Sequence, residues 1–175
     1  STTANVFRLV AEELELEDKV SVIDAGNLST GTSLMILQAA AMVKAGKTRA
    51  EICQAVEELK DKVQASFVVD TLIYLHRGGR CSSVAALAGG MLKLHPKIVV
   101  ADGSMSANKK YRGKMEKAIM DYVKDMKEEL KVADSERVFI THSGCEQVII
   151  DNVYTYLKEL NYFDEILITR AGGVI

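Results

Sequence analysis

The stretch that most limits the possible folds is a strand–helix–strand pattern near the C-terminal end. Residues 137–144 ("RVFITHSG") are rich in β-branched and apolar types, and residues 165–171 ("EILITRA") repeat that character. Between them, residues 146–161 ("EQVIIDNVYTYLKELN") carry apolar side chains at helical spacing. Two strands joined through a helix form a β-α-β unit, in which the strands run parallel and the helix covers the sheet. The pattern therefore predicts a β-α-β unit near the C-terminal end.

A β-hairpin and a long helix are predicted upstream of that unit. The stretch 97–113 ("KIVVADGSMSANKKYRG") holds two strand-like runs around Asp102-Gly103, a strong signal for a tight hairpin turn. Residues 112–131 then place apolar side chains at helical spacing among many charges. Hairpin and β-α-β unit together predict a mixed α+β domain.

The first seventy residues alternate predicted helices and strands. Residues 4–16 have Val6, Leu9, Val10 and Leu14 on one apolar face, and residues 29–45 have an almost wholly apolar middle, which predicts a deeply packed helix. Residues 19–25 are β-branched and apolar, as in a strand covered on both faces. The alternation predicts a layered α/β domain with a mainly parallel sheet.

Local signals mark the ends of these elements and a change of domain. Gly46 is placed to end the second helix, and Thr48 with Glu51 has the spacing of a capping box that opens a third helix through about residue 64. A second strand is predicted in "SFVVDT" (66–71). We place a soft boundary at 66–72, so that residues 1–68 are part of an N-terminal α/β domain and residues 69–175 a C-terminal α+β domain.

Composition excludes several function classes. The net charge is −2, so no basic field favours nucleic acid or an anionic membrane. No apolar run approaches the ~20 residues that span a bilayer, and we expect no stable membrane insertion. The three cysteines (Cys53, Cys81 and Cys145) and three histidines (His76, His95 and His142) are scattered, which predicts reduced thiols in a cytoplasmic protein and no metal site.

The segment "NLSTGTS" (27–33) raises the main functional question. Ser29 could simply cap the helix that follows. Alternatively, the unpaired N–H groups and positive dipole end of that helix could hold a phosphate or carboxylate, with Gly31 allowing close approach of the ligand. The spacing alone favours the cap, and the position after a strand of an open α/β sheet favours the ligand. The GxxxxGK[ST] pattern of a phosphate loop is absent.

Three other places carry weaker signals. Arg80, in "HRGGRCSS", could clamp an anion through its planar guanidinium, although a solvated arginine is the simpler interpretation. His142 could reach a site, but we favour a histidine with satisfied hydrogen bonds at the end of a strand. The basic hairpin residues Lys109–Lys114 could dock an acidic partner.

Five segments resemble the DegV-like fatty-acid-binding proteins, a family with the EDD fold, in order and spacing. They are "STTANVFRLVAEEL" (1–14), "VIDAGNLSTG" (22–31), "AGKTRAEI" (45–52), "FVVDTLIYLHRGGR" (67–80) and "ITHSG" (140–144). The fourth is the most specific. Relative to the family pattern, the chain is expected to be a piece: a Thr-Ser-x-Pro-Ser loop belongs before residue 1, and a His-x-Gly-Pro-Gly segment after residue 175.

The resemblance implies a two-domain DegV-like α/β fold that buries one long-chain fatty acid, such as palmitate or stearate, in an apolar tunnel between its domains. Hydroxyl groups hold the carboxylate, and the protein presents the lipid to a separate fatty acid kinase for phospholipid synthesis. It implies a cytoplasmic carrier and not an enzyme, with no cofactor and no catalytic residue. Burying about fourteen methylenes at ~0.8 kcal/mol each offers ~11 kcal/mol before ordering costs, so the carboxylate contacts mainly orient the ligand.

The resemblance also suggests ligand-binding residues. Ser1 matches the family serine that hydrogen-bonds the carboxylate, although Thr2 replaces the usual glycine. In the loop that matches Asp24–Gly31, Ala25 replaces a serine while the serine and glycine at 29 and 31 are kept. Arg80 matches an arginine near the head group and the kinase surface. The predicted ligand-binding residues are Ser1, Ser29, Thr30, Gly31 and Arg80.

Two other functions stay open. The first is an enzyme acting on a small phosphorylated or carboxylated metabolite, with Ser29, Arg80 and His142 at its site. The second is an interaction domain that binds an acidic partner through Lys109–Lys114.

Overall fold

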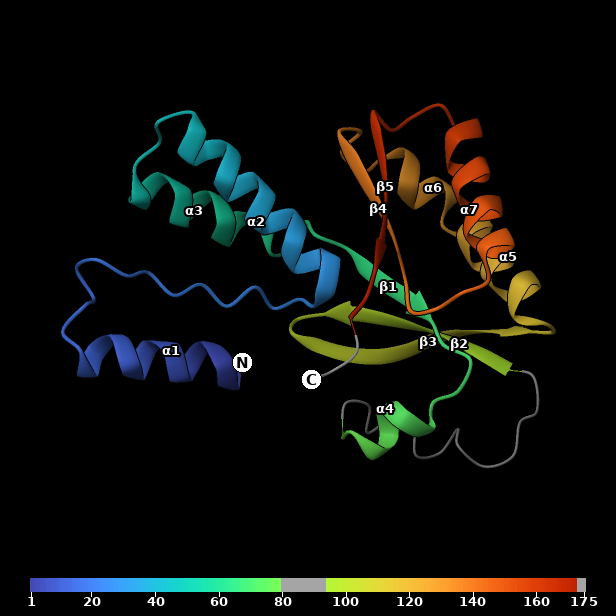
Figure 1. Ribbon diagram of the computed structural model, residues 1–175, viewed down its shortest axis with the longest axis horizontal. Helices are drawn as coiled ribbons and strands as arrows, with labels where there is room; N and C mark the ends of the chain where they lie inside the picture. Colours follow the sequence, from blue (N-terminus) through green and yellow to red (C-terminus); the bar gives the residue numbers. More distant parts are fainter. Residues whose placement is uncertain (80–93, 173–175) are drawn as a thin grey trace. The chain divides into compact units, whose positions relative to one another are not determined.

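The computed structural model describes residues 1–79 and 94–172 and has a mixed α/β fold (Figure 1). The predicted fold class is confirmed. The chain divides into two compact units, which are described separately. Unit 1 comprises Ser1–Ala65 and Val100–Met105, and unit 2 comprises Ser66–Val99 and Ser106–Ile175. The predicted domain boundary remains a prediction.

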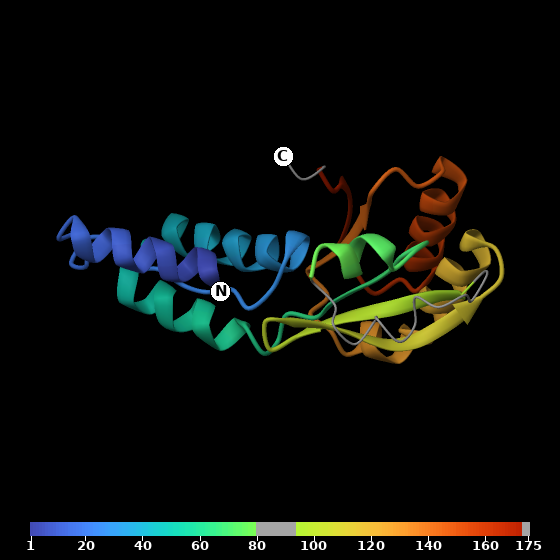
Figure 2. The ribbon, with the colours of Figure 1, turned by 90° about the horizontal axis from the view of Figure 1, so that it is seen from below.

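Unit 1 contains three helices. They are α1 (Thr2–Glu13), α2 (Ser29–Lys44) and α3 (Arg49–Leu59). The helices α2 and α3 lie side by side as a helical hairpin (Figure 2). The chain reverses its direction in the few residues between these two helices.

The turn between α2 and α3 follows the predicted signals. Gly46 has a φ of +73°, and its N–H donates to the carbonyl of Val43 (3.0 Å) while Lys47 N–H donates to Met42 (3.1 Å). This is a Schellman ending, which uses glycine because it needs a left-handed residue. Thr48 then opens α3 with both hydrogen bonds of the capping box to Glu51. Both expectations are confirmed, although α3 ends at Leu59 and not near residue 64.

The predicted strand at 19–25 is wrong. Lys19 ends a turn that follows α1, and residues 20–25 form no strand. A β-branched, apolar segment becomes a strand only when a neighbour accepts and donates its backbone hydrogen bonds. No other strand of the described part of unit 1 pairs with this segment.

The expected deep packing of α2 is also wrong for the described chain. Only Gly31 and Met35 of this helix are buried, and Val43 is 63% exposed. The predicted apolar face of α1 is likewise 44 to 63% exposed at Val6, Leu9, Val10 and Leu14. Apolar spacing shows which face of a helix can be buried, but burial needs a covering layer.

The predicted hairpin is confirmed. Strand β2 (Leu94–Ala101) turns at Asp102-Gly103 into β3 (Ser104–Arg112). Both turn residues have positive φ, 51° and 69°, as a type I′ turn requires. The strand β1 (Ala65–Val68) completes a sheet of order β1-β2-β3. After β1, the short helix α4 (Ile73–Arg77) ends at Gly78-Gly79.

Unit 2 also contains the predicted β-α-β unit. Strands β4 (Arg137–His142) and β5 (Glu165–Arg170) pair in parallel, with His142 opposite Arg170, and α7 (Gln147–Glu159) connects them. The helix α7 packs on these strands and on α5 (Met115–Asp125) (Figure 1). A buried cluster of Val123, Val153 and Leu157 forms this contact.

The predicted single helix over 112–131 is instead two helices. Its first part is α5, and a break at Met126 separates it from α6 (Lys127–Lys131). The N–H of Met126 donates to Val123 three residues back (3.2 Å), so the chain tightens at this point. Helical periodicity continued across the break, which is why the spacing alone did not indicate it.

Candidate functional site

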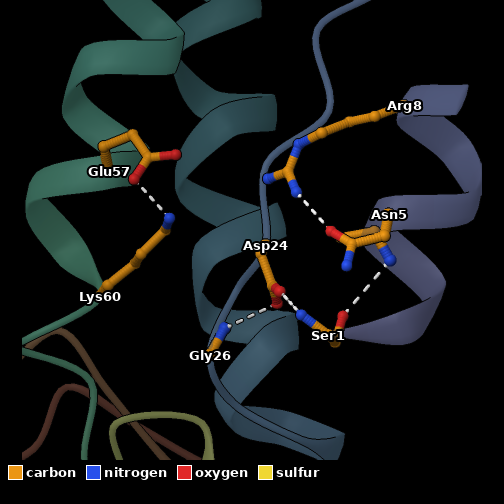
Figure 3. Close-up of polar contacts among 8 residues, drawn as sticks. Ser1, Asn5, Arg8, Asp24, Gly26, Glu57 and Lys60 are labelled. Atoms are coloured by element: carbon orange, nitrogen blue, oxygen red, sulfur yellow. Dashed lines mark hydrogen bonds and ion pairs between the residues drawn. The ribbon is translucent and has the colours of Figure 1, made fainter.

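The predicted head-group site begins at the N-terminus of α1. The Ser1 hydroxyl caps this helix by accepting the N–H of Ala4 at 3.3 Å. The Ser1 amino group forms an ion pair with Asp24, in the loop that precedes α2 (Figure 3). These contacts join the start of α1 to the Asp24–Leu28 loop.

Asp24 organises that loop. One carboxylate oxygen faces the Ser1 amino group and the other accepts the N–H of Gly26 at 3.3 Å (Figure 3). The amino group first, and then the Gly26 N–H, lower the pKa of Asp24 from 3.8 to about 2 against the opposing effect of burial. Asp24 is therefore ionised near neutral pH.

The next residues join the loop to the β2–β3 turn. Gly26 adopts a φ of +57°, and its carbonyl accepts the N–H of Gly103 at the tip of the hairpin (3.1 Å). A methyl group added at Gly26 would lie 3.8 Å from Gly103 N, an ordinary contact, so the backbone conformation and not crowding favours glycine here.

The start of α2 differs from the predicted cap. Leu28 occupies the N-cap position in extended conformation, and this helix has no side-chain capping bond. Ser29 is the first helical residue, is exposed and has a φ of +50°. The interpretation of Ser29 as a plain N-cap is therefore wrong. Within residues 1–79 and 94–172 no side-chain hydrogen bond caps this end of α2, where the helix dipole favours an anion.

The predicted residues in this turn are only partly brought together. Ser29, Thr30 and Gly31 share the first turn of α2; Thr30 is half-buried and Gly31 is buried. Ser1 is at the start of another helix, linked through the loop at Asp24. Arg80 lies outside the described residues. The assignment of all five as ligand-binding residues remains a proposal.

Sequence reasoning missed Asn27. Its side-chain amide donates to the carbonyl of Val63 (3.2 Å), and its oxygen accepts the N–H of Leu28 (2.9 Å). An ideal Cβ built on Gly31 would lie 2.1 Å from that oxygen. The space beside Gly31 that was expected to admit a ligand is thus filled by the Asn27 amide on its Cβ side. An asparagine followed four residues later by glycine at a helix start was the available signal.

His142 was expected to have satisfied hydrogen bonds, and this is wrong. Its Nδ1 is buried and has no hydrogen-bond partner in the described part of the chain. Cys53 and Cys145 are free thiols, half-buried, whereas Cys81 lies outside the described residues. Groups of three or more potential metal-ligating side chains do not occur among residues 1–79 and 94–172.

The basic hairpin is partly neutralised by α5. Lys109 pairs with Asp125 of this helix, whereas the Lys117–Asp121 pair lies within α5 itself. A shallow cavity of about 410 Å³ lies there and is lined by Lys109, Lys110, Tyr111, Arg112, Lys117, Asp121, Lys124 and Asp125. Burial first, and then Asp125, raise the pKa of Tyr111, although no group in the described part of the chain meets its hydroxyl with hydrogen-bond geometry. The predicted docking of an acidic partner on Lys109–Lys114 remains a prediction.

A helix N-terminus attracts anionic groups, so the start of α2 is the candidate ligand position within this mixed α/β fold. A sequence model of the family described as "Uncharacterised protein, DegV family" matches residues 1–175. The chain belongs to the DegV family.

Individual relatives agree. A DegV domain-containing protein of Clostridium perfringens is 32% identical over 95% of this chain and 58% of its own length. The structure of a DegV family protein from Thermus thermophilus, described as binding fatty acid, matches this chain with a TM-score of 0.80 at 25% identity. The match covers 97% of this chain and 60% of the Thermus protein. The Streptococcus pneumoniae Fatty Acid Kinase B3 protein, loaded with linoleic acid, has the same fold with a TM-score of 0.80 at 20% identity, over 97% of this chain and 60% of the other.

Two further facts bound these comparisons. The chain spans between half and two thirds of the length of these relatives. Among the helices that the structure describes, none combines the length and apolar character needed to cross a bilayer.

Proposed function

We propose that this chain binds one long-chain fatty acid, with the carboxylate held at the start of α2 and the acyl chain in an apolar tunnel. The observation that carries the proposal is the match to the Thermus thermophilus protein, which is described as binding fatty acid and covers 97% of this chain at a TM-score of 0.80.

The start of α2 supports the position of the carboxylate. Ser29 offers an exposed hydroxyl that caps nothing, in a turn where the helix dipole favours an anion. Ser1 supplies a second hydroxyl from the α1 N-terminus, and Thr30 and Gly31 belong to the same turn as Ser29. Arg80 is proposed to lie near the exposed head group.

The surface of α2 supports an apolar tunnel. Ile36 and Val43 are 61% and 63% exposed, and Leu37 is 40% exposed. Large aliphatic side chains exposed together on one helix are suited to contact another apolar group. An acyl chain is a suitable cover because it makes contacts of the same kind as a hydrophobic core.

Delivery to a fatty acid kinase is the second part of the proposal. The name of the Streptococcus pneumoniae protein, which shares the fold, supports such a partnership. In this role the chain is a cytoplasmic carrier that presents the carboxylate and performs no turnover itself, and the acyl phosphate would be made by the kinase for phospholipid synthesis.

The test is native mass spectrometry of the purified chain, followed by lipid extraction and titration with palmitate. We expect a 1:1 adduct that extracts as a free fatty acid, or uptake of one palmitate by delipidated protein. Hexadecanol, which has nearly the same tail but no carboxylate, is the matched control and should bind more weakly. Failure to retain or take up either lipid would refute the proposal for this chain.

A further inference from the structure

Asn27 connects two parts of unit 1 at the start of α2. Its amide nitrogen reaches the carbonyl of Val63, which follows α3, at 3.2 Å. Its amide oxygen accepts the N–H of Leu28, the N-cap residue of α2, at 2.9 Å. One short side chain thus ties the α2 start to the segment that leaves α3.

The same amide rests against Gly31. A Cβ at position 31 would lie 2.1 Å from the Asn27 oxygen and 2.6 Å from its Cγ, far inside van der Waals contact. Gly31 does not adopt a positive φ, so its backbone would accept alanine. Glycine at this position is therefore explained by the neighbouring amide and not by backbone conformation.

The turn that Asn27 holds contains an unfavourable backbone conformation. Ser29 has a φ of +50°, which is uncommon for residues other than glycine, asparagine and aspartate. Such a conformation persists only where surrounding contacts enforce it. The Asn27–Leu28 bond lies next to Ser29 on one side, and Gly31 N–H donates to Leu28 O (3.0 Å) on the other.

We propose that Asn27 is a positioning residue, which seats its amide against Gly31 and thereby sets the turn that presents Ser29 to the ligand carboxylate. The inference rests on the proposed function for its ligand, but the Asn27–Gly31 contact itself does not. In this proposal Gly31 has no side chain because the Asn27 amide occupies the space where its Cβ would lie. Asn27 acts through Ser29 and makes no contact with the lipid.

The contact is tested by thermal unfolding of Asn27→Ala, Gly31→Ala and the double variant, without ligand. Gly31→Ala alone should lower Tm, because the new methyl group expels the Asn27 amide. In the Asn27→Ala background the same substitution should raise Tm, since the clash is gone and alanine is the better helix former. A decrease of equal size in both backgrounds would overturn the contact.

The positioning role is tested by affinity for palmitate and hexadecanol. Asn27→Ala should weaken palmitate binding about fivefold or more while hexadecanol binding changes by less than about twofold, because only the carboxylate uses the turn. Asn5→Ala, which removes an exposed asparagine on α1, is the control and should change neither. Should Asn27→Ala fold poorly, Asn27→Ser removes the amide from the Gly31 contact without adding a charge and should show the same selective loss.

The two possible failures are distinguishable. Equal effects on palmitate and hexadecanol, or no effect on either, would overturn the positioning role even if the Tm comparison confirms the contact. If the unmodified chain binds neither lipid, the proposed function fails, and the positioning role fails with it. The Tm comparison would still decide whether Asn27 and Gly31 are coupled.

Discussion

Ser29→Ala provides the sharpest test of the head-group site, because the structure separates ligand binding from helix capping. The Ser29 side chain makes no capping bond and is exposed, so its removal should change the free energy of unfolding by less than about 0.5 kcal/mol. A hydrogen bond to a charged group is worth ~1.5–3 kcal/mol. At an exposed turn we take the lower end, which corresponds to roughly tenfold weaker palmitate binding.

Thr48→Ala is the matched control at a real cap. The Thr48 hydroxyl accepts the N–H of Glu51 at 3.3 Å, and the two residues form a complete capping box. Removing it should lower the free energy of unfolding by ~1 kcal/mol. Palmitate affinity should stay unchanged because α3 begins away from the proposed carboxylate.

Both variants are measured by urea denaturation without lipid and by calorimetric titration with palmitate. The expected result is a crossed pattern, in which Ser29→Ala loses affinity alone and Thr48→Ala loses stability alone. Unchanged palmitate affinity in Ser29→Ala, with the fold intact, would refute the assignment of Ser29 to the head group. A loss of stability equal to that of Thr48→Ala would show that Ser29 caps α2 after all.

Three further predictions concern stability. Leu157→Ala should lower the free energy of unfolding by ~3 kcal/mol, because Leu157 lies in the unit 2 core and is 4% exposed. Val148 is on the same helix but is 51% exposed, so Val148→Ala should lower it by less than ~0.5 kcal/mol. Both values are measured by urea denaturation. The pKa of the Asp24 carboxyl is lowered from 3.8 to about 2 in the folded chain. The ionised carboxylate therefore stabilises the fold fully above pH 3.8, and this contribution is lost as the pH falls towards 2. Between pH 5 and 2, the Tm should fall less in Asp24→Asn than in the unmodified chain. Tyr122→Phe should lower the free energy of unfolding by ~1–2 kcal/mol, since the Tyr122 hydroxyl donates to the Ser66 carbonyl at 2.9 Å. Ser66→Ala keeps that bond and should lower the free energy of unfolding by a smaller amount in the same denaturation assay.

Elements defined by nearest neighbours in sequence could be predicted. The turn at Asp102-Gly103 needs two left-handed residues, and aspartate followed by glycine is among the few pairs that supply them. The Thr48 capping box and the Gly46 helix ending likewise depend on residues within one turn of each other. The parallel pairing of β4 and β5 followed from the helix between them, which leaves few other topologies.

Features that depend on distant partners were not predictable in this way. Residues 19–25 have the composition of a strand but pair with no strand in the described part of unit 1. The helices α1 and α2 have apolar faces that remain largely exposed. In each case the sequence pattern records what a segment is suited to contact, and the contact itself requires chain that lies elsewhere.

The start of α2 shows how the same limit affects a functional interpretation. Serine and glycine at a helix start are compatible with a cap, with a ligand approaching the backbone, or with a side chain packed against the glycine. Only coordinates reveal that Ser29 has no capping bond and that Asn27 lies where a Gly31 Cβ would be. Glycine at position 31 is therefore needed for an internal contact even in a protein that binds no lipid. The hydroxyl at position 29 has no such internal role among the described residues. Ser29, and not Gly31, is therefore the residue whose substitution reports most directly on a ligand.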